Sequence, residues 1–238
     1  MSGDWNGSEL ARLRAAVYTA DGPTLVGLLT AHDPQPVLQS VGDALRVAVV
    51  RGVPGAAKQA RVCVTLLRSR DWPGDETLAD DLARAGDGRP PAPGLRAVAV
   101  DLEELTGLRD GDPVDGAGYL DLDSGECWPA AVLDDFGGEP GADEAPDRWL
   151  PVPCAGSRDA YRDMHEFTDG LTDALLARRL EDALAGRGAF RRFKDVLTDH
   201  PDLREQYFWF AGERGCGRAR AWLAGEGIRV VHRLEEAA

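Results

Sequence analysis

The residues best suited to binding a ligand lie in a short arginine-rich run between two predicted helices. Gly186 and Gly188 flank Arg187 directly before a helix predicted over Ala189–Leu197. Free backbone N–H groups at the start of a helix attract anions, and arginine side chains strengthen that attraction. The run therefore predicts an anion- or partner-binding site composed of Gly186, Arg187, Gly188, Arg191, Arg192 and Lys194.

Helical periodicity separates the cations of this run from its aromatic side chains. Arg187, Arg191 and Lys194 are spaced i, i+4 and i+7, so they share one face, which we call the basic face. Phe190 and Phe193 fall on another face, at the spacing of core residues. We expect the basic face to be exposed and both phenylalanines to be buried.

Two interpretations of the basic face remain open. In one, the cations dock on an acidic protein surface or a phosphate-bearing ligand. In the other, they pair with carboxylates of this chain. Asp195 lies four residues after Arg191, and Glu181 and Asp182 lie just upstream. Surface ion pairs of this kind are common and individually weak, so the sequence alone favours the second interpretation slightly.

The remaining chemistry-bearing residues give no pattern of an enzyme or a metal centre. The run Asp121–Glu126 resembles a calcium loop, but the twelfth position of that loop is Val132, and a turn explains its aspartates and glycine. The four histidines and four cysteines lack metal-ligand spacing. There is no P-loop, dinucleotide fingerprint or nucleophile elbow. We predict no catalytic residue, no metal and no cofactor.

The overall charge limits the possible partners. The chain has 238 residues, with 41 acidic against 27 basic side chains and a formal net charge of -14. Such a charge repels nucleic acid, so only a local basic patch could bind phosphate. No apolar stretch approaches the roughly 20 residues of a membrane span, and residues 1–5 do not begin a signal peptide. These features predict a soluble, cytoplasmic protein without membrane contact; its oligomeric state is open.

The elements that must position these residues fall into two groups. Residues 1–86 show apolar side chains at helical spacing, with turns at Gly52–Gly55 and Pro73–Gly74, and predict an all-helical bundle of antiparallel pairs. Residues 87–95 are rich in proline and glycine and predict a linker.

After this linker the apolar period changes from helical to alternating. Arg96–Val100 predicts a strand, and Tyr119–Trp128 predicts a hairpin with a turn at Gly125. Asp134–Asp147 is expected to be an exposed loop. Further helices are predicted over 157–167, 171–184, 189–197, 201–210 and 218–224, with short strands over 149–153 and 228–231. The fold class is α+β and predominantly helical: an N-terminal all-α bundle and a module over residues 96–238 with a small antiparallel sheet.

Several of these runs resemble a bacterial family. The run Gly186–Asp195, GRGAFRRFKD, is similar to the signature of Uncharacterised Protein Family 0158. Further similar runs are Val100–Leu105, Tyr119–Asp121 with Gly125–Glu126, Ser157–Tyr161 and Ala221–Leu223. The resemblance covers residues from about 97 to 238, and the preceding residues look like an extension found in actinobacterial relatives. It implies a fold unit and no activity.

We interpret the chain as a non-enzymatic interaction or regulatory module that presents its basic face to an anionic partner. Nucleic-acid binding through the same face is one alternative, and it predicts an affinity that falls steeply with salt. An enzyme of unrecognised type is the other, and it predicts a deep pocket that holds groups with shifted pKa values.

Overall fold

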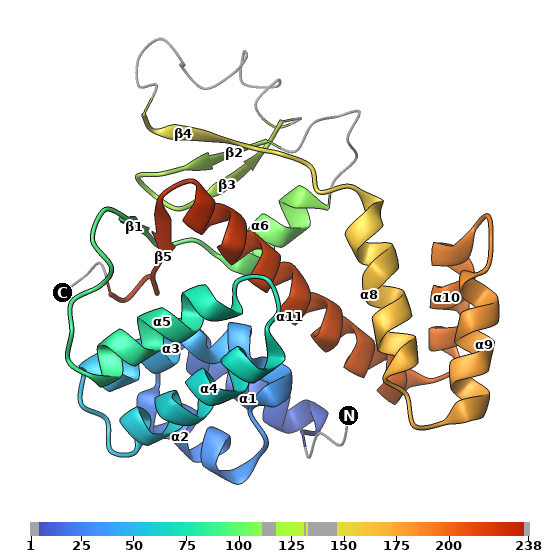
Figure 1. The fold of residues 1–238 in the computed structure, drawn as a ribbon, viewed down its shortest axis with the longest axis horizontal. Coiled ribbons are helices and arrows are strands. Elements are labelled where there is room, and N and C mark those ends of the chain that lie inside the picture. Colours follow the sequence, from blue (N-terminus) through green and yellow to red (C-terminus); the bar gives the residue numbers. More distant parts are fainter. Residues whose placement is uncertain (1–4, 111–117, 131, 133–146, 236–238) are drawn as a thin grey trace.

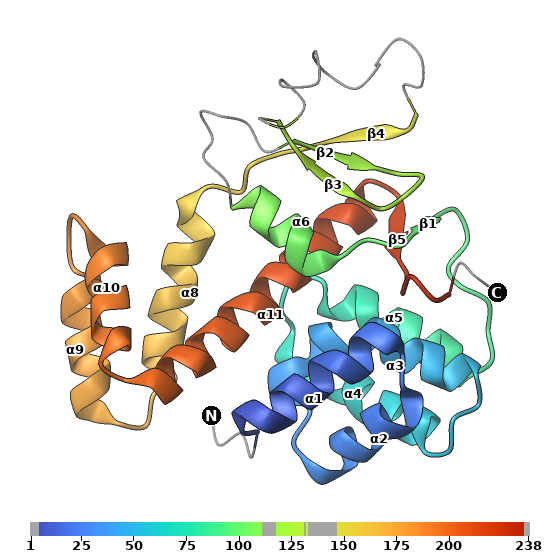
Figure 2. The same cartoon turned by 180° about the vertical axis from the view of Figure 1, so that it is seen from behind.

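A computed structural model describes residues 5–110, 118–130, 132 and 147–235 (Figures 1 and 2). The helices are α1 (Gly7–Thr19), α2 (Gly22–Ala31), the short 3-10 helix η1 (Gln35–Val37), α3 (Leu38–Val50), α4 (Ala56–Arg70), α5 (Asp75–Gly86), α6 (Leu102–Arg109), α8 (Ser157–Asp169), α9 (Ala174–Leu184), α10 (Ala189–Thr198) and α11 (Pro201–Gly225). The strands are β1 (Arg96–Val98), β2 (Gly118–Asp121), β3 (Cys127–Pro129), β4 (Trp149–Val152) and β5 (Ile228–Val230). The predicted fold class, predominantly helical α+β with a small antiparallel sheet, is confirmed.

Helices α1 to α5 pack around one apolar core, in the lower part of Figure 1. Each helix contributes at least one leucine that is no more than 1% exposed. These are Leu13, Leu25, Leu45, Leu67 and Leu78. Burial of side chains of this size contributes about 1.5–3 kcal/mol each, so this shared core stabilises the bundle.

The predicted hairpin forms two strands of a three-stranded antiparallel sheet with the order β3-β2-β4. A separate parallel pair joins β1 to β5, with Arg96 opposite Ile228. The sequence predicted both strands of this pair but not their pairing, because their residues lie about 130 positions apart in the chain. The predicted loop over Asp134–Asp147 falls almost wholly outside the described residues.

The hairpin turn is stabilised by the carboxylate of Asp121. Its oxygens accept hydrogen bonds from the backbone N–H of Asp123 at 3.0 Å and the Ser124 hydroxyl at 3.0 Å. Arg148 donates two more, at 2.9 and 2.6 Å, and together with these bonds it lowers the pKa of Asp121 to about 2. Both carboxylate oxygens thus accept hydrogen bonds that hold the turn, which agrees with the prediction of a turn in place of a calcium loop.

Helix α11 corrects a prediction. The sequence predicts two helices, 201–210 and 218–224, because glycines separate them, but the structure has one helix of 25 residues. These glycines permit close contacts instead of ending the helix. A Cβ on Gly215 would lie 2.5 Å from Cγ2 of Thr106, and one on Gly217 would lie 2.3 Å from the Pro73 carbonyl oxygen.

A buried polar network fixes α11 against the bundle. The Glu213 carboxylate, 2% exposed, accepts hydrogen bonds from the backbone N–H groups of Gln39 and Ser40, both at 2.8 Å. These are two of the free donors at the start of α3, which has no cap from its own segment. Arg70 donates to the same carboxylate at 3.2 Å, which supplies the opposite charge.

A second buried pair lies two turns further along α11. Arg220 is 2% exposed and donates to Asp43 at 3.0 and 2.8 Å and to the Gln39 side chain at 2.9 Å. Residues 87–95 connect α5 to β1 outside these contacts (Figure 1). Helix α11 contacts α3 and α5 directly, so the two predicted segments, residues 1–86 and 96–238, pack against each other. Their division into separate domains stays a prediction.

None of the helices in the described ranges is both long enough and apolar enough to cross a lipid bilayer.

Candidate partner-binding site

The predicted site lies on a three-helix unit formed by α8, α9 and α10, which extends from one end of α11 (Figure 1). Asp163 holds α8 to α11, because its buried carboxylate accepts hydrogen bonds from Arg214 at 2.6 Å and from Arg218 at 3.0 and 2.7 Å. An apolar cluster that includes Phe167 and Phe193 fills the space between the helices. The site therefore rests on a rigid support.

Arg192 builds the turn between α9 and α10. Its Nε donates to the Ala183 carbonyl at 3.1 Å and Nη2 to the Ala185 carbonyl at 2.6 Å, while Nη1 donates to the Arg187 carbonyl. The guanidinium group thus takes up carbonyl groups left free at the end of α9. Arg192 thus contributes three hydrogen bonds to this turn, and its predicted part in partner binding stays a prediction.

Tyr161 of α8 completes this turn from the other side. Its hydroxyl donates to the Leu184 carbonyl at 3.0 Å, and its ring lies 6.3 Å from the ring of Phe190 between centroids. Two runs that resemble the family, Ser157–Tyr161 and Gly186–Asp195, therefore meet in space. Sequence reasoning gave no sign of this contact, because it depends on how α8 crosses α10.

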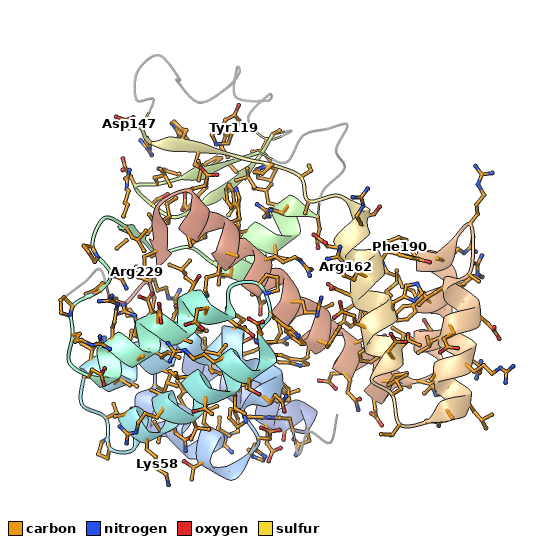
Figure 3. The ribbon with its side chains drawn as sticks, viewed as in Figure 1. Lys58, Tyr119, Asp147, Arg162, Phe190 and Arg229 are labelled. Atoms are coloured by element: carbon orange, nitrogen blue, oxygen red, sulfur yellow. The ribbon has the colours of Figure 1, made fainter. Side chains whose placement is uncertain are left out.

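The burial prediction holds for Phe193, which is 0% exposed, and is wrong for Phe190, which is 37% exposed. Phe190 lies between the basic face and α8, and its ring is tilted by 46° to the ring of Tyr161. Figure 3 labels Phe190 of α10 and Arg162 of α8 near the same end of these two helices. Arg162, which the prediction missed, is 59% exposed and lies 3.5 Å from Asp159. An apolar ring therefore adjoins the basic face.

The basic face itself is exposed, as predicted. Arg187, Arg191 and Lys194 are all exposed, and 90% of the Arg191 side chain is accessible. Arg191 lies 4.0 Å from Asp195, which is itself 70% exposed, so this pair is weak. Within the described ranges, Arg187 and Lys194 form no ion pair.

The two glycines of the site have structural roles. Gly186 and Gly188 both have φ of +78°, a left-handed conformation that residues with side chains rarely adopt. Gly188 is the N-cap of α10, which has no side-chain cap. Its first N–H groups lie beside Arg187 and provide the anion-attracting geometry that the sequence predicted.

Three of the four thiols are not activated for nucleophilic chemistry. Burial raises the pKa of Cys63, Cys127 and Cys216 to about 12, so each thiol is protonated at neutral pH. In the part of the chain that the structure describes, no three His, Cys, Asp or Glu side chains converge on a possible metal position.

The geometry defines a predominantly helical α+β protein with an exposed basic face on a helical hairpin. Residues 120–236 match the model of the uncharacterised protein family UPF0158. The UPF0158 protein PA5073 of Pseudomonas aeruginosa strain PAO1 is 26% identical over 145 residues, 58% of this chain and 90% of that protein. Residues 120–236 therefore belong to this family, as the resemblance predicted. No solved structure matches it.

Proposed function

We propose that the chain is a non-enzymatic interaction module whose basic face docks on an acidic surface of a partner protein. The observation that carries this proposal is the exposure of Arg187, Arg191 and Lys194 in a chain of net charge -14. Arg187 and Lys194 form no ion pair within the described residues, and Arg191 has only the weak pair with Asp195 at 4.0 Å, so the three cations retain hydrogen-bond donors for an external acceptor.

The exposed ring of Phe190 supports a protein partner. Interfaces combine charged rims with aromatic anchors that lose their contact with water, and arginine beside aromatic residues is typical of them. Phe190, 37% exposed and backed by Tyr161, has the position of such an anchor.

Nucleic acid fits this surface less well. Three cations can neutralise about three phosphates, and the remaining charge of the molecule opposes the approach of a polyanion. A cysteine nucleophile is disfavoured at Cys63 and Cys216, since a nucleophile requires a lowered pKa and burial raises the pKa of both thiols.

A photo-crosslinking experiment tests the proposal directly. A photoreactive phenylalanine analogue at position 190 of the full chain should crosslink a partner protein in cells, and Arg191→Glu with Lys194→Glu should abolish the crosslink. The matched control is Lys58→Glu with Arg61→Glu, which reverses one lysine and one arginine on the exposed face of α4. Figure 3 shows Lys58 on the side of the molecule away from α10.

The outcomes separate the competing classes. Loss of the crosslink in the α10 variant and its retention in the α4 variant support the proposal. Equal loss in both variants indicates a response to net charge and contradicts it. A crosslink to RNA or DNA that nuclease removes assigns the face to nucleic acid, and then the affinity should fall steeply as salt rises.

A further inference from the structure

A groove runs between the bundle and the C-terminal half, away from the basic face. It consists of a cavity of about 660 Å³ that adjoins a smaller one of about 210 Å³. Arg14, Glu103 and Trp209 line both cavities, which shows that they are continuous. We call this pair of cavities the interhelical groove, because α1 forms one wall, α6 the other, and α11 the floor; Figure 2 shows these helices on one side of the molecule.

The size and position of the groove suit a small ligand. Ligand pockets have volumes of about 300–1,000 Å³ and often lie where two structural units meet. Here α1 and α3 contribute residues from the first third of the chain, and α6, α11 and the hairpin turn contribute residues from the rest.

Carboxylates dominate the charge of the groove. Five carboxylates and two guanidinium groups line the larger cavity. Asp43 is neutralised by Arg220, and Asp101 accepts the first N–H groups of α6. The carboxylates of Glu103, Glu104 and Glu126 are exposed and form no ion pair with any side chain of the described ranges.

Two aromatic rings of the groove, Tyr18 on the α1 wall and Trp209 on the α11 floor, already contact cations. The Arg14 guanidinium lies 4.5 Å from the centroid of the Trp209 ring, and that of Arg233 lies 3.3 Å from the centroid of the Tyr18 ring. Tyr18 is 64% exposed, so its ring remains accessible beside Arg233. Aromatic faces attract ammonium and guanidinium groups through the charge distribution of the ring, and the attraction grows when water is excluded.

The two α3 residues with uncharged polar side chains that line the groove, Gln39 and Ser40, offer no competing anion site. Ser40 donates its hydroxyl to Glu213 at 2.7 Å, and the Gln39 side chain is hydrogen-bonded to Asp75 and Arg220. A ligand would therefore contact the glutamates of α6 and the hairpin turn and the rings of Tyr18 and Trp209, while Gln39 and Ser40 keep their internal partners.

We propose that the interhelical groove binds an organic cation, a primary ammonium or guanidinium group carried on an aliphatic stem. The carboxylates of Glu103, Glu104 and Glu126 would receive the charged group, and Tyr18 and Trp209 would contact the stem. This site is separate from the basic face, and it gives the molecule a second binding surface of opposite charge.

Calorimetric titration of the full chain with spermidine at low ionic strength tests this proposal. We expect one site per chain and a Kd that rises by about tenfold or more in Glu103→Lys with Glu104→Lys, because two attractive charges become repulsive. Glu181→Lys with Asp182→Lys is the matched control, since it makes the same charge change at two exposed positions of α9. The variant Arg191→Glu with Lys194→Glu should bind spermidine at least as tightly as the wild type.

The first two outcomes test whether the groove binds a cation specifically, and the third identifies the kind of molecule that carries the cation. Equal weakening in the α6 and α9 variants would reveal general attraction to an acidic molecule and overturn the proposal. Binding of an uncharged aliphatic diol as tight as that of spermidine would overturn it as well. If the groove binds, a terminally blocked arginine–lysine peptide that binds more tightly than spermidine assigns the cation to a partner protein, and the reverse order assigns it to a free polyamine.

Discussion

The arginines of α11 and the cations of α10 occupy opposite environments. Arg214 and Arg220 are 7% and 2% exposed, and each is hydrogen-bonded to a carboxylate from another helix. Arg187, Arg191 and Lys194 are exposed, and Asp195 is the one acid of the described residues within 4.0 Å of them. Basic side chains therefore stabilise the fold in α11 and remain exposed to solvent in α10.

The difference teaches how to assign a role to an arginine in an acidic chain. An arginine is structural when another helix or strand places a carboxylate beside its guanidinium group at a buried position. Breaking such a buried pair costs about 3–5 kcal/mol, whereas an exposed pair contributes about 0–1 kcal/mol. The comparison predicts opposite phenotypes for the two groups.

The largest effect is expected for Arg220→Ala. It leaves Asp43 without its cation at a mostly buried position and should lower the free energy of unfolding by about 3–5 kcal/mol. Urea denaturation measures this value. Replacement of both partners, Arg220→Met with Asp43→Leu, should lose much less, because no unpaired charge remains. A loss below about 1 kcal/mol for the single variant would break the comparison.

A second large effect concerns the apolar support of the basic face. Phe193→Ala should destabilise the protein by about 3 kcal/mol or more, since the ring is 0% exposed and the change leaves a cavity. Phe190→Ala, at 37% exposure, is the internal control and should lose less than half as much. Equal losses would show that Phe190 is part of the core.

Arg192→Ala tests whether this arginine belongs with the structural group. The variant removes the donor to the Ala183 carbonyl, whose residue is buried, and to the carbonyl of Ala185, which is exposed and can bind water. We expect a loss of about 1 kcal/mol and no change in partner capture. Loss of capture with unchanged stability would return Arg192 to the binding surface.

The pH dependence of stability provides a smaller test in the hairpin. The pKa of Asp121 is about 2 in the folded chain, below its ordinary value of 3.8. Its contribution is therefore present above pH 3.8 and is lost as the pH falls through 2. Because Arg148 is partly exposed, screening reduces this contribution to about 1 kcal/mol. Asp121→Asn should remove that part of the acid sensitivity measured by the thermal midpoint.

The smallest effect on stability is expected for the basic face. Arg191→Glu with Lys194→Glu should change the free energy of unfolding by no more than about 0.5 kcal/mol, because both side chains are exposed and weakly paired. The same variant should abolish the crosslink from position 190. A destabilisation comparable to that of Arg220→Ala would show that the basic face is structural.

Local patterns were sufficient to predict much of the fold. Apolar spacing and turn residues identified the bundle helices, the hairpin and the last strand, and the GRGAFRRFKD run identified the family. The break expected in α11 was wrong, because a glycine that ends a helix cannot be distinguished by sequence from one that permits Thr106 or Pro73 to approach. The pairing of β1 with β5 depends on contacts that no local pattern contains.

The candidate site was predicted only in its general form. Spacing placed Arg187, Arg191 and Lys194 on one exposed face, but it treated Arg192 as equivalent to them. The role of Arg192 is set by the path of the chain around Gly186 and Gly188, which brings the α9 carbonyls within reach. The interhelical groove was not predicted at all, since its walls come from segments that are distant in the sequence.

The position of Glu213 affects how the protein is made. The start of α3 obtains its acceptors from a residue 174 positions later, so the helices of the bundle emerge from the ribosome long before that carboxylate exists. Until position 213 has been synthesised, Arg70 also lacks its Glu213 partner. Until α11 is made, the start of α3 therefore lacks these two acceptor contacts, so this part of the fold can be completed only after the bundle helices have been synthesised.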